Sequence, residues 1–531
     1  MSAPVTERPT RRDQIGATTT DLPPASADRG FFGHPRGLAT LFATEMWERF
    51  SFYGIRPLLI LFMTAALADG GFGFTRDQAS PIVGIYAASV YLSSLPGGWV
   101  ADRLLGLRRA VLTGAVLICL GHLSIGLSAF AHGKVPFFLG LILIVLGTGL
   151  LKPNISAIVG DLYPEGGARR DAGFSVFYMG INSGAFLGQL VTGVLGEKVG
   201  WHWGFGAAGV GMLIGLITFY VRAPKTLGTI GLHPARHPDP AIDARQRSTA
   251  KLGLSLGLAA LALVVVLASI GTITIDAAAV GRSFTVVLGT IAALYFGYLF
   301  FAAGLDGDEK KRVAVILVLF VFSAIFWAAF EQAPTSLNLF ARDFVDRRLG
   351  SFEIPATWFQ SVNSFFIIVF APVFAALWLG LARRGIDLSS PAKFAFGLLV
   401  TGVGFGIMVV AANAIVASGG TLKVSPWWLN VSYLLQTFGE LSVSPVGLSS
   451  MTKLAPRKFV GQMMGVWFLA TSVGNLIAGL VGGRVDPEKL EQTPALFTWT
   501  AVALIGSGIV LALLAIPIRR MMANVGDVKA E

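Results

Sequence analysis

Residues 45–56 read EMWERFSFYGIR, and the apolar run PLLILFM follows at residues 57–63. The stretch places Glu45, Glu48, Arg49 and Arg56 in a segment that is otherwise suited to lipid. At ~100° per residue, the four charged side chains fall on one face of a helix. Each charge costs ~2.5 kcal/mol or more on insertion scales, and such residues commonly mark an ion or substrate pathway. The stripe therefore predicts a helix that lines an aqueous cavity, although an ion pair between Glu45 and Arg49, at i and i+4, would also lower the cost.

The composition around this stretch is that of an integral membrane protein. Of the 531 residues, 54% are hydrophobic and 13% are charged. Apolar windows of ~20 residues, long enough to cross ~30 Å of hydrocarbon as helices, recur along the whole chain. We predict an all-α polytopic fold with fourteen spans at residues 38–66, 80–101, 110–130, 136–158, 173–195, 204–221, 252–271, 283–303, 313–333, 355–380, 394–418, 428–450, 460–482 and 493–516.

The distribution of positive charge predicts the orientation. Fourteen spans place both termini on one side, and most of the 41 Lys and Arg residues lie in the loops and tails of that side. The positive-inside rule makes this side cytoplasmic, so the net charge of +11 is explained by the membrane and not by a nucleic-acid partner. One loop on the outer side departs from the rule, because it carries Arg342, Arg347 and Arg348.

The spans form a pattern of six, two and six. The longest polar interruption follows the sixth span, and Lys310, Lys311 and Arg312 open the last six. Two six-helix halves are typical of carriers that bind substrate near the midplane, which leaves the central pair peripheral. The predicted parts are a cytoplasmic tail at 1–36, a six-helix bundle at 37–221, a linker at 222–251, an extra helix pair at 252–303, a second bundle at 304–516 and a tail at 517–531.

Charged residues recur at equivalent positions of the two halves. Glu331 lies on the first helix of the second half, as the EMWER charges do in the first half, and Lys152 and Glu440 lie on the fourth helix of each half. Opposite charges at matching positions predict salt bridges that form and break between the halves, and a carboxylate released from such a bridge can take up a proton. Static hydrogen bonding between helices is the alternative for these residues.

Several motifs carry a family resemblance. EMWERFSFYG resembles the ExxERFxxYG signature of the proton-coupled oligopeptide transporters, the POT or PTR family, a branch of the major facilitator superfamily. FYMGINSGAF at 177–186 and GELSVSPVGLSSM at 439–451 resemble the fifth-helix and tenth-helix blocks of that family. Further matches are GTGLLKPNIS at 147–156, FWAAFEQ at 326–332, FQSVNSFFIIVFAPVFA at 359–375 and the superfamily loop motif DRLLGLRR at 102–109. The resemblance implies the major facilitator fold with two extra central helices.

The resemblance also implies a role for each matching residue. Proton coupling is assigned to Glu45, Glu48, Arg49 and Glu331. Arg56 and Lys152 would meet the peptide carboxylate, and Glu440 would bind the peptide amino terminus. Amides that contact the peptide backbone, or bond between helices, are Asn182 and Asn363. The aromatic pocket positions are Tyr53, Tyr91, Trp327 and Trp467. The loop motif, which suits a conformational latch, contributes Asp102, Arg103, Gly106, Arg108 and Arg109.

Two departures from the family pattern concern Phe52 and histidine. Phe52 stands where several members have tyrosine, and the span at 80–101 contains no histidine, so proton transfer would rest on carboxylates. We expect no metal and no cofactor other than the coupling proton.

We therefore predict a symporter of the cytoplasmic membrane that imports di- and tripeptides with protons by alternating access, for which a monomer suffices. A nitrate, other small-anion or drug-like substrate on the same fold is the alternative. The sequence contains no HExxH motif, which disfavours a metalloprotease-type enzyme. A channel is disfavoured because opposite charges in matching half-repeats suit alternating access.

Overall fold

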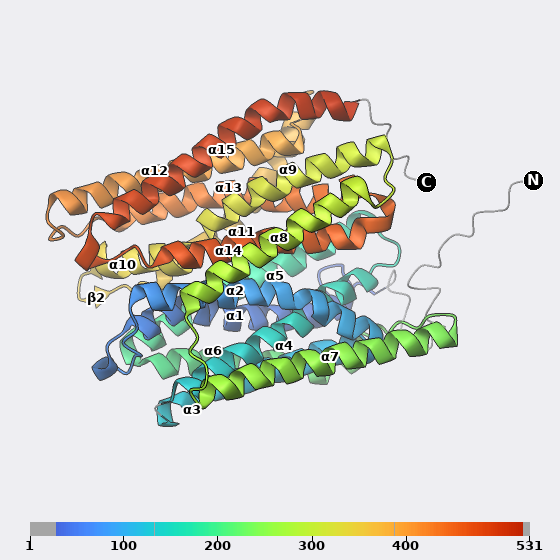
Figure 1. The fold of residues 1–531 in the computed structure, drawn as a ribbon, viewed down its shortest axis with the longest axis horizontal. Helices are drawn as coiled ribbons and strands as arrows, with labels where there is room; N and C mark the ends of the chain where they lie inside the picture. The colour runs from blue at the N-terminus through green and yellow to red at the C-terminus, as the bar shows by residue number, and fades with distance from the viewer. Residues whose placement is uncertain (1–27, 132, 387, 524–531) are drawn as a thin grey trace, which may run out of the picture. The chain divides into compact units, whose positions relative to one another are not determined.

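The computed structural model describes residues 28–131, 133–386 and 388–523, and nearly all of them are helical (Figure 1). Fourteen long helices correspond one to one with the fourteen predicted spans, which confirms the all-α polytopic fold. The first seven are α1 (Arg36–Thr64), α2 (Arg76–Val100), α3 (Leu107–Ala131), α4 (Lys134–Asp161), α5 (Gly167–Val194), α6 (Trp201–Thr226) and α7 (Pro240–Ser269). The others are α8 (Ala277–Phe301), α9 (Gly307–Phe330), α11 (Trp358–Arg383), α12 (Ser390–Ala417), α13 (Pro426–Leu454), α14 (Val460–Gly482) and α15 (Gln492–Ala523).

Several helices extend beyond the apolar windows that predict them. α7 begins twelve residues before its predicted span, because the Asp239 side chain accepts hydrogen bonds from the backbone N–H groups of Ala241 and Ile242 and so caps a polar first turn. α15 likewise continues to Ala523, through the beginning of the predicted tail. Polar turns outside the lipid are thus helical here, although hydropathy does not detect them. The remainder of the two predicted tails, residues 1–27 and 524–531, lies outside the described residues.

Ten of the described helical segments are long and apolar enough to span a membrane by themselves. The four long helices that fall outside this set are α1, α2, α5 and α13. Each of them carries polar or charged candidate residues, with Arg56 on α1, Tyr91 on α2, Asn182 on α5 and Glu440 on α13. These are the helices in which polar side chains interrupt the apolar surface.

Short elements join α9 to α11. A π-helical turn (η4, Ala333–Leu337) continues α9 into the seven-residue helix α10 (Asn338–Phe344). A two-stranded hairpin follows, in which β1 (Arg348–Leu349) pairs antiparallel with β2 (Phe352–Glu353), so that Arg348 lies opposite Glu353. Gly350 makes the turn with φ 63°, a left-handed conformation that glycine adopts without strain.

By its contacts the chain divides into two compact units. The first consists of the described parts of Met1–Ser51, Ser93–Gly184 and Ala208–Ile275, and in it α3 packs along α4. The second consists of the described parts of Phe52–Leu92, Ala185–Ala207 and Asp276–Glu531. In the second unit α12 packs against α13 and α15, and α14 packs against α8 and α9 (Figure 1).

The predicted central helix pair is divided between the two units. α7 belongs to the first unit, where it contacts a π-helical turn (η2, Ala101–Leu105). α8 belongs to the second unit, where it contacts α9 and α14. The assignment of 37–221 and 304–516 to two six-helix bundles remains a prediction.

Candidate functional site

The three charges of the EMWER motif contact one another within α1. The Arg49 Nε atom lies 3.2 Å from Glu45 Oε1 and also pairs with Glu48 Oε2. All three residues are almost completely buried. The intrahelical ion pair that sequence reasoning considered is therefore present, and it involves both carboxylates.

Two residues of α4 complete this cluster in the first unit. Thr148 Oγ1 donates a hydrogen bond of 3.5 Å to Glu48 Oε1. Lys152, four residues and about one helical turn further along α4, lies near enough to Glu45 to interact with its charge. Glu45 and Glu48 thus share Arg49, and Lys152 adds a second positive charge beside Glu45, so protonation of one carboxylate affects the other.

Asn182 lies in the same unit on α5. Its side chain is buried, and Nδ2 donates 3.0 Å to the carbonyl oxygen of Tyr178, one turn earlier in its own helix. Gly184 on the same helix approaches the backbone of α1 at the carbonyl oxygen of Met46, where a Cβ atom has no room. Helix α5 is therefore held directly against the EMWER segment.

Arg56 lies in the second unit and pairs with Glu331 at the end of α9. Arg56 Nη2 contacts Glu331 Oε2, and the same nitrogen donates 3.2 Å to Asn475 Oδ1 on α14. The side chains of Arg56 and Glu331 are 8% and 4% exposed, so the pair is shielded from bulk water. A buried pair of this kind is costly to break by removal of one partner, since the other charge is then left without compensation.

Asn363 on α11 holds Glu440 on α13. Asn363 Nδ2 donates to Thr437 Oγ1 at 2.9 Å and to Glu440 Oε2 at 3.2 Å. Glu331 is near enough to interact electrostatically with Glu440. A carboxylate that is oriented by an amide and half-buried suits the binding of an ammonium group.

The aromatic candidates pack as edge-to-face or stacked pairs in the second unit. The rings of Trp327 and Trp467 lie 6.4 Å apart with their planes at 80°, and Tyr91 stacks on Phe468 at 6.4 Å. Tyr53 packs edge-on against Phe52 at 5.1 Å. The buried Trp327 Nε1 donor has no hydrogen-bond partner among the described residues.

Phe52, the departure from the family pattern, is itself buried. Its ring stacks on Tyr86 of α2 at 6.0 Å. The position is therefore occupied by an apolar contact within the second unit.

The loop motif folds back on the segment that follows α6. Asp102 and Arg103 lie in η2, and Gly106 ends this π-helical turn with φ 80°. A Cβ atom on Gly106 would lie 2.9 Å from the carbonyl oxygen of Leu232, so glycine is required both by conformation and by space.

Arg108 fastens the same contact, because its backbone N–H donates to Gly231 O at 2.9 Å and its Nη1 donates to Gly228 O at 2.7 Å. Arg109, the last residue of the motif, is exposed. The positive-inside rule accounts for a positive charge at this position but not for these hydrogen bonds. Arg108 therefore has a specific structural contact as well.

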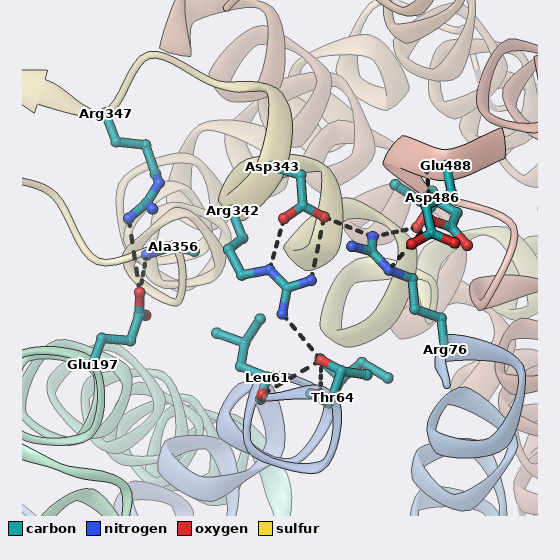
Figure 2. Close-up of polar contacts among 12 residues, drawn as sticks. Leu61, Thr64, Arg76, Glu197, Arg342, Asp343, Arg347, Ala356, Asp486 and Glu488 are labelled. Atoms are coloured by element: carbon teal, nitrogen blue, oxygen red, sulfur yellow. Dashed lines mark hydrogen bonds and ion pairs between the residues drawn. The ribbon is translucent and has the colours of Figure 1, made fainter. Parts of the chain in front are cut away.

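Polar contacts that sequence reasoning missed join the ends of several helices in the second unit, and Figure 2 shows them. Arg76 Nη1, at the start of α2, lies 2.6 Å from Asp343 Oδ2, and its Nε lies 3.9 Å from Asp486 Oδ1. Arg342 also bonds to Asp343 and donates to Thr64 Oγ1 at 3.0 Å. We call Arg76, Arg342, Asp343 and Asp486 the outer charge cluster.

A second group of charges surrounds the β-hairpin. Glu197 accepts hydrogen bonds from the backbone N–H groups of Ala356 and Thr357, at 2.8 and 3.0 Å, and faces Arg347 (Figure 2). Arg347 also pairs with Glu353, to which Lys198 Nζ donates at 3.0 Å. The hydrogen bond from Lys198 and the neighbouring cations hold the pKa of the Glu353 carboxyl below its ordinary value, against the effect of burial.

These contacts explain the loop that departs from the positive-inside rule. Arg342 has Asp343 as its partner, and Arg347 has Glu197 and Glu353. The partners lie up to 150 residues away along the chain, so no local pattern reveals them. Asn475 was missed as well, although an amide within an otherwise apolar helix is itself a signal of a polar contact.

Comparison with known proteins identifies the family. A family model described as the POT family matches residues 108–225 and 253–495. The chain is 49% identical over 507 residues to the peptide transporter YePEPT of Yersinia enterocolitica, covering 96% of this chain and 98% of that protein. It is 36% identical to a di-/tripeptide transporter of Lactococcus lactis, covering 94% of this chain and 98% of the relative.

Among solved structures, the crystal structure of a peptide transporter POT in complex with sulfate superimposes with a TM-score of 0.85 at 40% identity. That alignment covers 94% of this chain and 98% of the other. Since the family model matches more than half of the residues and the likeness extends over nearly the whole chain, the protein belongs to the POT family and has its major facilitator fold.

Proposed function

We propose that this protein is a proton-coupled symporter that imports di- and tripeptides across the cytoplasmic membrane by alternating access, with both termini in the cytoplasm. The observation that carries the proposal is the arrangement of Glu440 on α13, whose carboxylate accepts a hydrogen bond from Asn363. A short peptide has an ammonium group at one end and a carboxylate at the other, and Glu440 supplies a partner for the first. The names of two relatives, a peptide transporter and a di-/tripeptide transporter, agree with this substrate class.

The other candidate residues divide between substrate and proton. Arg56 and Lys152 are proposed to meet the peptide carboxylate, while Trp327 and Trp467 bound the space for side chains. The edge-to-face contact of these two rings supports this role. Asn182 and Asn363 are proposed to contact the peptide backbone, and Tyr53 and Tyr91 to complete the aromatic pocket.

Proton coupling is proposed to rest on the two ion-pair clusters. In the first, Arg49 is shared between Glu45 and Glu48. In the second, Glu331 pairs with Arg56. Protonation of a carboxylate in either cluster weakens its ion pair with the arginine, which links proton binding to a change of partners. A proton is the only coupling species that these residues require.

The test is uptake of a labelled dipeptide into proteoliposomes, with and without an inward proton gradient. We expect the wild type to accumulate dipeptide above equilibrium only when the gradient is imposed. Glu48→Gln is expected to abolish this accumulation, because a carboxamide cannot bind and release a proton, while gradient-independent counterflow of peptide persists. Glu491→Gln, which alters an exposed carboxylate, serves as the matched control and is expected to behave as the wild type.

The alternative cargo is tested in the same vesicles. Uptake of nitrate or of another small anion, with no uptake of any di- or tripeptide by the wild type, would overturn the proposal. Accumulation of dipeptide that Glu48→Gln leaves intact would overturn the role of Glu48 in coupling but not the substrate class.

A further inference from the structure

We propose that Asn475 is a positioning residue for transport. Its amide oxygen holds the Arg56 guanidinium beside Glu331 and remains the partner of Arg56 while Glu331 is protonated. The inference rests on the proposed function, because it assigns Glu331 a protonation step, and it extends that function to a residue of α14 that no motif singles out.

The first observation is that Asn475 and Glu331 share one nitrogen of Arg56. Nη2 donates to both Glu331 Oε2 and Asn475 Oδ1, and Asn475 is only 2% exposed. Among the described residues, the side-chain hydrogen bonds of Arg56 go to these two acceptors. Asn475 is thus the neutral acceptor of the pair, and it keeps its acceptor capacity at every pH.

The second observation is that the amide is oriented. Asn475 Nδ2 donates 2.9 Å to the carbonyl oxygen of Thr471, one turn earlier in α14. Since the nitrogen is engaged by this carbonyl, the oxygen is the atom that faces Arg56. The amide cannot rotate by 180° without losing both hydrogen bonds.

The third observation is that the backbone beneath Asn475 is fixed. Ser80 Oγ of α2 donates 2.7 Å to Gly479 O of α14. A Cβ atom on Gly84 would lie 2.7 Å from the carbonyl oxygen of Asn475, so the two helices touch at that residue. The backbone of Asn475 is therefore held in place by a close helix–helix contact. A side chain on such a backbone can keep Arg56 in one position.

The charged and titratable groups around the pair come from three helices. Tyr53 of α1 and Tyr91 of α2 lie near enough to interact with Arg56, and Glu440 of α13 lies near enough to interact with Glu331. Glu440 is held by Asn363. When Glu331 gains a proton, the buried guanidinium therefore keeps the dipole of Asn475 as its hydrogen-bond partner.

This arrangement predicts pH shifts of opposite sign for two substitutions. Asn475→Leu removes the second acceptor, so Arg56 stabilises the ionised form of Glu331 more strongly and protonation requires a lower pH. Asn475→Asp supplies a second carboxylate, so Arg56 stays compensated when Glu331 is protonated and protonation occurs at a higher pH. If the two substitutions only disturbed packing, they would not shift the pH of protonation in opposite directions.

The experiment measures gradient-driven uptake of a labelled dipeptide, and its counterflow, as a function of pH in proteoliposomes. We expect the midpoint of the pH profile to shift by about one unit toward acid in Asn475→Leu and toward alkali in Asn475→Asp, a tenfold change in proton affinity in each case. Asn413→Leu, the same substitution at an exposed position of α12, is the matched control and is expected to leave the midpoint unchanged. Melting temperature in detergent shows whether each variant folds.

The outcomes separate this inference from the proposed function. Unchanged midpoints, or shifts of the same sign, in folded variants that still exchange peptide would overturn the role of Asn475 alone. Absence of dipeptide uptake by the wild type would overturn the proposed function. If neither variant folds, the same pH profile measured for Asn475→Gln, whose longer side chain retains an amide oxygen, is expected to keep the wild-type midpoint. An acid shift like that predicted for the leucine variant would then contradict the proposal.

Discussion

At the scale of single residues, Glu197 acts as a cap for a helix that begins 160 residues later in the chain. Its two carboxylate oxygens accept the backbone N–H groups of Ala356 and Thr357, just before α11. These N–H groups have no partner within the helix, and a negative charge near a helix N-terminus is favourable. One side chain thus fixes the end of α5 to the beginning of α11.

We predict that Glu197→Gln destabilises the protein. The carboxamide retains one acceptor oxygen but turns an NH₂ group toward a backbone N–H, which leaves a donor unsatisfied at a cost of ~1–3 kcal/mol. The measurement is the melting temperature of the purified protein in detergent. Glu353→Gln, in a pair whose carboxylate is half exposed, is the control, with an expected cost of ~0–1 kcal/mol. Equal melting temperatures for the two variants would contradict the capping role.

Single-residue predictions from the sequence succeed in locating the charges and fail in naming their partners. Glu45 and Arg49 are four residues apart, so helical geometry alone predicts their contact. Glu331 and Arg56 are 275 residues apart, and the opposite charges at matching positions of the two halves predict salt bridges without naming this pair. Asn475 carries no charge, so no count of ionisable residues includes it.

At the scale of helices, α2 and α14 meet at a pair of glycines. A Cβ atom on Gly84 would lie 2.8 Å from Gly479 Cα, and one on Gly479 would lie 2.7 Å from Gly84 Cα. The neighbouring atoms belong to backbone and cannot rotate away. The contact therefore depends on the absence of side chains at both positions.

We predict that Gly84→Ala separates α2 from α14 and lowers the melting temperature, since the added methyl group forces the backbones apart. Because the same contact supports Asn475, the variant is also expected to shift the pH midpoint of transport in the direction of Asn475→Leu. Gly289→Ala of α8 is the control, as its Cβ atom would have open space around it. In a helix interior that change is neutral or stabilising by up to ~1 kcal/mol. A Gly84→Ala protein that melts with the wild type would show that the helices are not in close contact.

The elements that hydropathy predicts well are those that cross lipid. The span at 460–482 coincides with α14, whereas α7 begins well before its window because Asp239 caps a polar turn. The short helix α10 and the β-hairpin were not predicted, because a seven-residue helix and two-residue strands are too short for a periodic signal. Their positions are set by partners elsewhere in the second unit, such as the hydrogen bond from Asn338 to Pro57 O.

At the scale of the whole molecule, alternating access requires contacts that close one side and then separate. The outer charge cluster joins the start of α2 to α10 and to the segment after α14, and its side chains are partly buried. These ends belong to the second unit and lie on the side that the positive-inside rule predicts to be external. The cluster is therefore suited to stabilising a state that is closed to the outside.

We predict that Arg76→Gln increases external access to the contact between α2 and α14. The reporter is a cysteine at the buried position Ser80, in a Cys119→Ser background, labelled by a membrane-impermeant thiol reagent. A loss of ~1–2 kcal/mol from the closed state corresponds to a labelling rate that is ~5- to 30-fold higher. Lys489→Gln, which removes an exposed pair with Asp77, is expected to leave the rate unchanged. Equal labelling in both variants would show that the cluster does not hold this side closed.

The fold class and the number of spans follow from the sequence because crossing a membrane requires long apolar helices, and the family follows from motifs such as EMWERFSFYG. The grouping of contacts into two units does not follow, because α1 contributes its beginning to one unit and its end to the other. A boundary between units that falls inside a continuous helix cannot be predicted from composition or hydropathy. The proton and substrate roles remain proposals that transport measurements decide.

The degree of exposure of the ion pairs in the second unit also sets how the protein responds to the salinity of its surroundings. Arg76 and Asp343 are 15% and 13% exposed, so dissolved salt screens their attraction weakly, whereas Lys198 and Glu353, at 29% and 49%, lie within reach of counterions. With a Debye length of ~10 Å at 0.1 M and ~3 Å at 1 M, a brine would weaken the pairs around the hairpin well before the outer charge cluster. In a cell that moves from dilute to saline water, the ion pairs around the hairpin would thus weaken while those of the outer charge cluster persist.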